Sequence, residues 1–224
     1  MKQHLILFLI FSLPLSSGRL ALGDDWPSFR GGAFRRGSVD DTAAFHRPSL
    51  AWRSMNKDHI SPAYASSPAI VGDRVFVGLA EQSVFSATGR VLCFDLATGK
   101  QSWEAETRYP VFSSPSVSGG KVFVGEGFHQ DSDCSLYAFA AASGKKLWSF
   151  TTGSHLESSP HIADGRVFFG AGDDGVYCLD SADGRKLWHQ GGLHVDISPL
   201  LSGGLVYAGS GYGKLEAFAL DGRS

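Results

Sequence analysis

The feature that most constrains this chain is a repeat. Four times, a Ser-Pro dipeptide is followed by a short polar turn, a run rich in Val, Phe and Tyr, and a glycine ten residues after the proline. The intervals between successive prolines are 47, 45 and 39 residues. A period of about 40 residues built from short apolar runs predicts a β-propeller, in which each repeat forms one blade. The pairs are Pro68 and Gly78, Pro115 and Gly125, Pro160 and Gly170, and Pro199 and Gly209.

Each repeat offers four antiparallel strands, which are clearest in the third copy, residues 159–188. There we expect strands over 161–163, 166–170, 175–180 and 186–189. The apolar residues of the two middle strands are consecutive rather than alternating, which indicates burial on both faces, as in a blade between two blades. Turn pairs such as Asp-Gly and Gly-Gly recur about every ten residues, so a helical interpretation fails. The predicted fold class is therefore all-β.

A second pattern closes three of the repeats, over residues 93–103, 138–148 and 178–188. Each segment ends in Gly-x-x-x-Trp, and this resembles the tryptophan-docking motif of pyrroloquinoline-quinone-like (PQQ-like) β-propeller repeats. The resemblance covers about residues 50–224 and implies a structural role, with each Trp wedged between blades and each Gly allowing close approach of backbone. The residues concerned are Gly99 and Trp103, Gly144 and Trp148, and Gly184 and Trp188.

The chain holds about four blades, near residues 67–103, 114–148, 159–188 and 198–224. A Trp-bearing segment at 50–53 precedes the first blade, and the fourth ends where its Trp strand should begin. The family that the motif resembles builds rings of seven or eight blades, so we expect an incomplete ring. The alternatives are a closed four-bladed ring completed by the segment of Trp52, and two chains sharing one eight-bladed ring. An open arc would leave an apolar blade face bare for dimerisation or aggregation.

The first 23 residues have the pattern of a signal peptide. Lys2 precedes an apolar run over residues 5–15, which is too short to span a bilayer, and small residues follow it. We therefore expect a periplasmic or extracellular protein with no membrane span after the signal is removed. Residues 24–49 show no clean periodicity and are expected to form a lead-in segment that runs over the propeller rim.

Charge and cysteine content exclude several classes of function. The formal net charge is −2 and no long basic stretch is present, so nucleic acid is not an expected partner. Of the three cysteines, Cys93 and Cys178 occupy the same position in different repeats, and a whole repeat should separate them. That separation exceeds the Cα distance that a disulfide allows, so no intrachain disulfide is expected.

One constellation is a candidate ligand site. His155 and His194 each stand five residues before a Ser-Pro proline, and Glu157 and Asp196 stand three before it. Because both segments enter the innermost strand of a blade, the two pairs should lie at one end of the propeller, near its axis. There they could bind a divalent cation or a polar ligand. The alternative is that they are hydrogen-bonded connector residues duplicated with the repeat.

The other polar motifs favour plain structural roles. Repeats one and two carry Ala63/Ala65 and Pro110/Phe112 at the matching positions, so no full ring of ligands is expected. An insertion at 128–134 contains Asp-x-Asp but lacks the Gly and Glu of a complete calcium loop, which favours a solvated loop. Asp173-Asp174-Gly175 is read as a hairpin turn, and repeat one carries an insertion near 81–88. We expect no catalytic residues, no resident metal and no cofactor.

These observations predict an exported, non-enzymatic PQQ-like propeller that acts as a protein-interaction or ligand-binding scaffold. Its expected partners are other proteins, bound through propeller faces or blade edges, or a second copy bound through an open blade face. The alternative is a fragment of a periplasmic PQQ-dependent oxidoreductase. The resemblance implies that such enzymes carry two adjacent cysteines, a calcium site and a carboxylate base. No two cysteines are adjacent in this chain, so bound PQQ is not expected.

Overall fold

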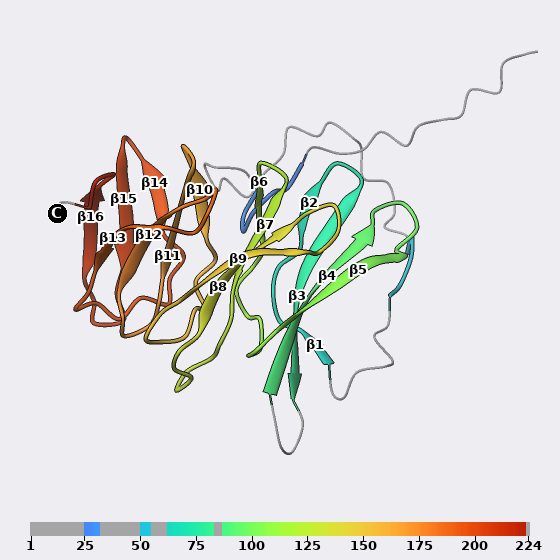
Figure 1. The fold of residues 1–224 in the computed structure, drawn as a ribbon, viewed down its shortest axis with the longest axis horizontal. Coiled ribbons are helices and arrows are strands. Elements are labelled where there is room, and N and C mark those ends of the chain that lie inside the picture. Colours follow the sequence, from blue (N-terminus) through green and yellow to red (C-terminus); the bar gives the residue numbers. More distant parts are fainter. Residues whose placement is uncertain (1–24, 32–49, 55–61, 83–86, 223–224) are drawn as a thin grey trace, which may run out of the picture.

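The computed structural model describes residues 25–31, 50–54, 62–82 and 87–222, and this part of the chain is built from strands and turns alone. The strands form antiparallel sheets that stand side by side as the blades of a partial propeller (Figure 1). The predicted all-β fold class is confirmed. The predicted signal peptide, residues 1–23, lies outside the described residues, as does most of the predicted lead-in. No helix able to span a membrane is found in the described part.

The four sheets follow the four repeats in order. Blade 1 contains β1 (Pro62–Tyr64), β2 (Ala69–Val71), β3 (Arg74–Gln82), β4 (Ala87–Asp95) and β5 (Gln101–Thr107). Blade 2 contains β6 (Ser116–Ser118), β7 (Lys121–Gly125), β8 (Ser135–Ala140) and β9 (Lys146–Thr151). Blade 3 contains β10 (His161–Ala163), β11 (Arg166–Gly170), β12 (Val176–Asp180) and β13 (Lys186–Gln190). Blade 4 contains β14 (Leu200–Ser202), β15 (Leu205–Gly209) and β16 (Leu215–Ala219).

The strands of blade 3 agree with the sequence-based expectation to within one residue at each end. Blade 1 differs more. Its insertion lengthens β3 and β4 into one hairpin, whose pairing reaches Gln82 and Ala87. The longer β3 extends past β2 and offers a free edge, and β1 pairs with that edge from Pro62 to Tyr64. The fifth strand was not predicted, because the repeat pattern carries no signal for it.

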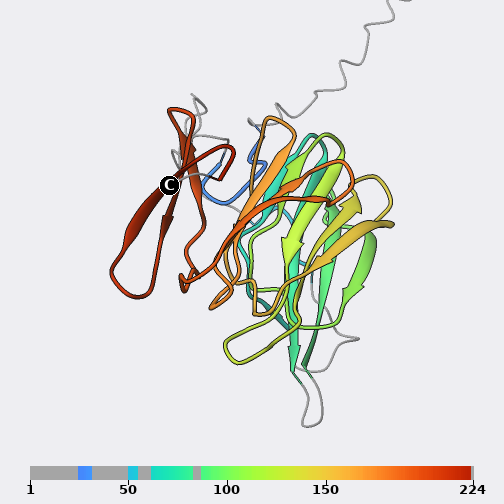
Figure 2. The ribbon, with the colours of Figure 1, turned by 60° about the vertical axis from the view of Figure 1, so that its left-hand side comes forward.

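The arc is open in the described part of the chain. The innermost strands contact one another in the order β2, β6, β10, β14, and blade 4 has three strands. The segment of Trp52 adds no strand to blade 4 within residues 50–54, and Trp52 lies against blade 1 instead. Figure 2 shows blade 4 at the end of the row of sheets. This arrangement is a partial propeller and not the alternative ring of four blades closed by Trp52.

The lead-in was expected to run over the propeller rim, but its described part, residues 25–31, lies along inner strands instead. Trp26 pairs with Ile70 of β2 through two backbone hydrogen bonds of 2.7 Å, and the Val117 N–H of β6 donates to the Pro27 carbonyl at 2.7 Å. Both partners belong to innermost strands, whose free edges face the propeller axis. Unpaired backbone groups on an exposed edge favour an added segment. Residues 25–27 satisfy these groups on blades 1 and 2.

Each tryptophan of the repeat reaches the blade that follows it. A Cβ added to Gly184 would stand 2.7 Å from the ring of Trp148, and the same ring-over-glycine contact recurs along the chain. Gly184 also has a φ of 76°, which favours glycine. The Trp188 indole N–H donates to the Leu220 carbonyl at 2.8 Å. We call this set the tryptophan–glycine girdle, and its pairs are Trp52 and Gly99, Trp103 and Gly144, Trp148 and Gly184, and Trp188 and Gly222.

The Ser-Pro dipeptides link the blades at their inner strands. The Ser114 N–H donates to the Ser159 hydroxyl at 2.9 Å, and Ser159 N–H donates to the Ser198 hydroxyl at the same distance. Ser67 N–H donates to Ser114 in the same way. The serine of the repeat therefore sets the spacing of consecutive blades, which agrees with the structural role that its recurrence predicts.

The three thiols are free and buried. Burial raises the pKa of Cys93 to about 11 and the pKa values of Cys134 and Cys178 to about 12. Because the thiolate is the reactive form, these cysteines are packing residues rather than nucleophiles at neutral pH.

Candidate functional site

The four candidate ligand residues lie in two connectors. His155 and Glu157 belong to the connector from β9 to β10, and His194 and Asp196 belong to the connector from β13 to β14. The structure brings the two connectors into contact. His155 Nε2 lies 3.0 Å from Asp196 Oδ1, and His194 Nε2 lies 2.8 Å from Asp196 Oδ2. His155 thus reaches a carboxylate 41 positions further along the sequence, and it shares that carboxylate with His194.

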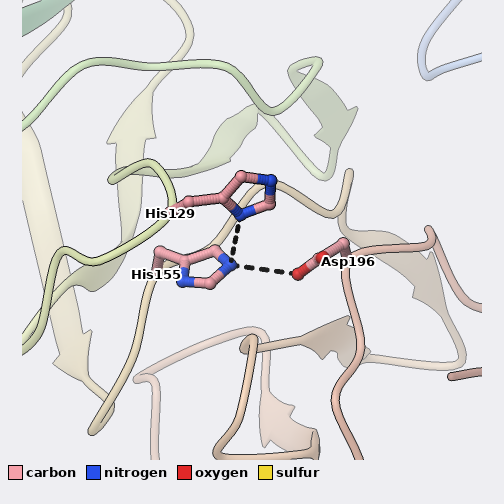
Figure 3. A group of neighbouring side chains, drawn as sticks. All are labelled: His129, His155 and Asp196. Carbon is pink, nitrogen blue, oxygen red and sulfur yellow. Dashed lines mark hydrogen bonds and ion pairs between the residues drawn. The ribbon is translucent and has the colours of Figure 1, made fainter. Parts of the chain in front are cut away.

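Two further residues, which the sequence analysis had assigned to other roles, complete the group. His129 comes from the blade 2 insertion, and its Nδ1 lies 3.0 Å from Glu157 Oε1. The same nitrogen lies 3.4 Å from His155 Nε2 (Figure 3). Asp173 comes from the β11–β12 turn, and its Oδ1 lies 2.7 Å from His194 Nδ1. We call the group the histidine–carboxylate cluster, and its members are His129, His155, Glu157, Asp173, His194 and Asp196.

The repeat itself explains why both connectors reach this place. Leu156 and Val195 lie against Gly125 and Gly170, so close that a side chain on either glycine would collide with them. Leu156 N–H donates to the Glu126 carbonyl at 3.0 Å, and Val195 N–H donates to the Gly172 carbonyl at 2.8 Å. Successive side chains of an extended chain point to opposite sides. With Leu156 and Val195 packed on a blade, their polar neighbours turn towards the other connector.

Burial varies across the cluster. The His155 side chain is only 4% exposed, whereas the His129 side chain is 52% exposed. The Ser154 hydroxyl lies 3.2 Å from His155 Nδ1, so that ring nitrogen has a partner of its own. The hydrogen bond with Asp173 and the charge of nearby Asp196 raise the pKa of His194. The cluster is therefore a polar centre anchored by buried His155, and its most exposed histidine is His129.

The insertion that carries His129 is held by a buried carboxylate. Glu126 is fully buried and accepts hydrogen bonds from the Tyr109 N–H, the Ser135 N–H and the Tyr137 hydroxyl at 2.9 to 3.1 Å. Burial raises its pKa. Sequence reasoning did not find Glu126, because a single Glu after a strand carries no motif. Its role is to fix the base of the β7–β8 loop.

The Asp-x-Asp fragment of the same loop does not join the cluster. Asp131 Oδ2 accepts the Phe128 N–H at 2.8 Å, which closes a local turn, and Asp133 is exposed. Asp173 and Asp174 do form the predicted hairpin turn, and Asp174 accepts the Gly153 N–H at 2.7 Å. Turn residues thus gain contacts that the turn pattern alone does not reveal.

One of two hollows in the described part of the chain borders the cluster. An open cleft of about 370 Å³ lies beside the cluster, and His155, Asp131 and Asp173 are on its wall. A hollow of about 520 Å³ lies between blades 1 and 2, with Arg74 and Asp73 in its lining. Arg74 there donates to the Ala141 carbonyl at 2.8 Å, so its guanidinium is already engaged. The cleft at the cluster is the better candidate for ligand access.

Comparison with known proteins places the fold of this chain among β-propellers. A family model described as outer membrane protein assembly factor BamB matches residues 38–155 and 128–224. No curated protein sequence matches the chain.

Three solved structures illustrate the likeness. BamB from Moraxella catarrhalis is 17% identical with a TM-score of 0.55, and the match covers 72% of this chain and 64% of that one. The computationally designed Ika4 protein is 17% identical with a TM-score of 0.58, covering 71% of this chain and 94% of that one. Quinohemoprotein alcohol dehydrogenase from Comamonas testosteroni is 12% identical with a TM-score of 0.61, covering 89% and 48%. This chain thus spans less than two thirds of the natural proteins among the three, and the likeness concerns the fold.

Proposed function

The chain belongs to the family of PQQ-like propeller repeats whose model is described as outer membrane protein assembly factor BamB. From this membership we propose that the protein is an exported, non-enzymatic scaffold. In this proposal the N-terminal segment directs export, and the protein binds other proteins of the cell envelope through its blade faces and edges. The name of the family refers to an assembly factor, which favours a role in protein association over a catalytic one.

The observation that carries the proposal is the outer face of blade 4. Leu215 is 76% exposed there, and Ala217 beside it is also exposed. In blade 3 the corresponding residues, Val176 and Cys178, are fully buried in the contact with blade 4. The outer face of blade 4 therefore has the strand pattern of a blade that packs against a neighbour. An exposed apolar face of this kind marks a protein contact.

The partner at this face is a protein surface, and a second copy of the chain is the simplest example. Blade-to-blade packing is the contact that this fold makes repeatedly, and Tyr207 of β15 lies opposite Ala217 on the same face. Tyr and Leu together supply apolar area with one polar tip, which suits an interface. The face can thus bind a blade edge or blade face of another molecule.

A fragment of a PQQ-dependent oxidoreductase is the second candidate. The likeness to the Comamonas enzyme over 89% of this chain favours it. The residues of the cluster do not fit the quinone, because PQQ itself carries three carboxylates and the cluster presents the carboxylates of Glu157, Asp173 and Asp196. The chain also lacks adjacent cysteines. We therefore assign no step of a reaction to PQQ in this chain.

The solution mass of the chain without residues 1–23 tests the proposal, by light scattering after size exclusion. We expect self-association that rises with concentration and is lost in Leu215→Asp. Leu187→Asp is the matched control, because Leu187 is an exposed leucine on the outermost strand of blade 3, outside the proposed face.

A wild-type chain that stays monomeric at all concentrations would contradict the role of the blade 4 face as a self-association surface. Stoichiometric uptake of PQQ with dye-linked alcohol oxidation would favour the second candidate instead.

A further inference from the structure

We propose that His129, His155, Glu157 and Asp196 form a binding site for a divalent transition-metal ion of the zinc class. The site goes beyond the scaffold function and does not depend on it. It draws on three parts of the propeller: the blade 2 insertion, the connector into blade 3 and the connector into blade 4.

The donor atoms converge at distances that suit one ion. His129 Nδ1 and His155 Nε2 are 3.4 Å apart, and His155 Nε2 and Asp196 Oδ1 are 3.0 Å apart. The donor atoms of these three residues all lie within 4.8 Å of one another. Glu157 Oε1 lies 3.0 Å from His129 Nδ1 and 3.8 Å from His155 Nε2. A tetrahedral zinc ion with metal–nitrogen distances of about 2.0–2.1 Å separates its ligand atoms by about 3.3 Å.

Hydrogen bonds satisfy only part of this arrangement. His155 can donate to Asp196 and His129 can donate to Glu157, but the 3.4 Å contact between the two ring nitrogens is then left without a proton. His155 Nε2 faces three electronegative atoms, one each from His129, Glu157 and Asp196. A neutral imidazole carries one N–H, so Nε2 donates at most one hydrogen bond. If His155 Nε2 is deprotonated, its lone pair points at the lone pairs of Glu157 Oε1 and Asp196 Oδ1. A cation at the centre turns this convergence of lone pairs into coordination.

Neighbouring residues orient the ligands as metal sites require. The Ser154 hydroxyl can accept the Nδ1–H of His155 at 3.2 Å, which leaves the Nε2 lone pair for the ion. His194 binds the second oxygen of Asp196 through Nε2 and binds Asp173 through Nδ1. Both ring nitrogens of His194 are thus engaged, so His194 is a positioning residue that aims Asp196 Oδ1 at the site.

The donor set also selects the kind of ion. Two imidazole nitrogens with two carboxylates match zinc and similar first-row divalent ions, whereas calcium and magnesium prefer oxygen ligands. Two neutral imidazoles and two carboxylates balance a charge of +2. Because the His129 side chain is half exposed and His155 borders the open cleft, the ion has a path from solvent.

The experiment uses the chain without residues 1–23, zinc chloride as the probe, and isothermal titration with thermal unfolding as readouts. The wild type should bind one zinc ion per chain and gain several degrees in Tm, because an ion that binds only the folded state stabilises it. His129→Ala should weaken zinc binding at least tenfold and abolish the gain in Tm. His189→Ala is the matched control, since His189 lies outside the cluster, against Tyr177. It should bind zinc as the wild type does.

Cobalt(II) provides a second test that does not depend on stability. Cobalt bound at the wild-type site should show the intense visible bands of tetrahedral coordination, and Glu157→Gln should reduce them. His155→Ala removes a buried side chain and can unfold the protein, so His129→Ala and Glu157→Gln carry the decision. Zinc binding that is absent from the wild type, or that is equal in His129→Ala and the wild type, would overturn the proposal.

Discussion

The tryptophan–glycine girdle and the histidine–carboxylate cluster are built on opposite principles. The girdle repeats one contact from blade to blade, with Trp103 over Gly144, Trp148 over Gly184 and so on at fixed offsets. The cluster uses each of its residues once. Its connector positions are filled by Pro110 and Phe112 where the chain enters blade 2, and Phe112 packs on Phe128 instead of joining a polar group.

The difference shows which positions stabilise the fold and which positions are available to form a binding site. A residue that recurs in every blade answers a need that every blade has, namely packing on the next one. A residue that departs from the repeat is free of that need, since the backbone is already held by Leu156 or Val195. If this division is correct, variants in the girdle change stability and variants in the cluster change ligand binding.

The largest effect should come from removing a girdle ring. Trp148→Ala should lower the free energy of unfolding by about 3 kcal/mol, because it empties the space between blades 2 and 3. Trp148 packs against Phe123 as well as Gly184, with ring centroids 5.7 Å apart. Urea unfolding followed by fluorescence or circular dichroism measures the change. Leu147→Ala, at a neighbouring side chain that is 44% exposed, should be nearly neutral, and equal losses in both would contradict the account.

The next effect separates ring contact from backbone strain. Gly184 and Gly165 have φ angles of 76° and 72°, but only Gly184 has a tryptophan ring against it, while the position of a Cβ at Gly165 is open. Gly165→Ala should cost about 1 kcal/mol from the left-handed backbone alone. Gly184→Ala should cost more, because the ring of Trp148 must move as well. Chemical denaturation of both variants tests this order, and a smaller loss in Gly184→Ala would break it.

A buried carboxylate beneath the cluster should give stability a defined pH dependence. The pKa of Glu126 is raised in the folded state, so its contribution is fully present below the pKa of the unfolded chain. The contribution is lost as the pH rises from the unfolded pKa through the folded pKa, because the Glu126 carboxyl loses its proton at lower pH in the unfolded chain than in the folded one. The stability difference between the wild type and Glu126→Gln should therefore shift in favour of the wild type on acidification. Urea titrations at several pH values measure it, and a parallel pH profile for both proteins would refute it.

The smallest effect on stability should come from the cluster itself. In metal-free buffer, His129→Ala should change the free energy of unfolding by less than about 0.5 kcal/mol, since the side chain is half exposed. Thermal unfolding in the presence of a chelator gives this value. A loss as large as that of Trp148→Ala would show that the cluster belongs to the packing of the fold.

Much of the fold is predictable because the residues that recur in the repeat are those that pack one blade against the next. The strands of blade 3 and the three strands described for blade 4 follow from offsets between Pro, Gly and Trp. The extra strand β1 was not predicted, and Trp26 was expected at the rim rather than against Ile70. Both segments pair with free strand edges, and a free edge accepts any extended segment.

The cluster is predictable only in part, for the same reason. His155, Glu157, His194 and Asp196 stand at matching offsets from a proline, so the register links them. His129 and Asp173 come from an insertion and a hairpin turn, whose paths no periodic pattern specifies. Only the three-dimensional arrangement brings His129 Nδ1 to 3.4 Å from His155 Nε2.

The most direct test of this division is one thermal-unfolding experiment on the wild type, Gly184→Ala and His129→Ala, each with a chelator and with zinc. The account predicts that Gly184→Ala lowers Tm but keeps the zinc-dependent rise, whereas His129→Ala keeps Tm but loses the rise. Variants that lose both properties together, or a zinc-dependent rise that persists in His129→Ala, would contradict the claim that the repeat carries the fold and its departures carry the site.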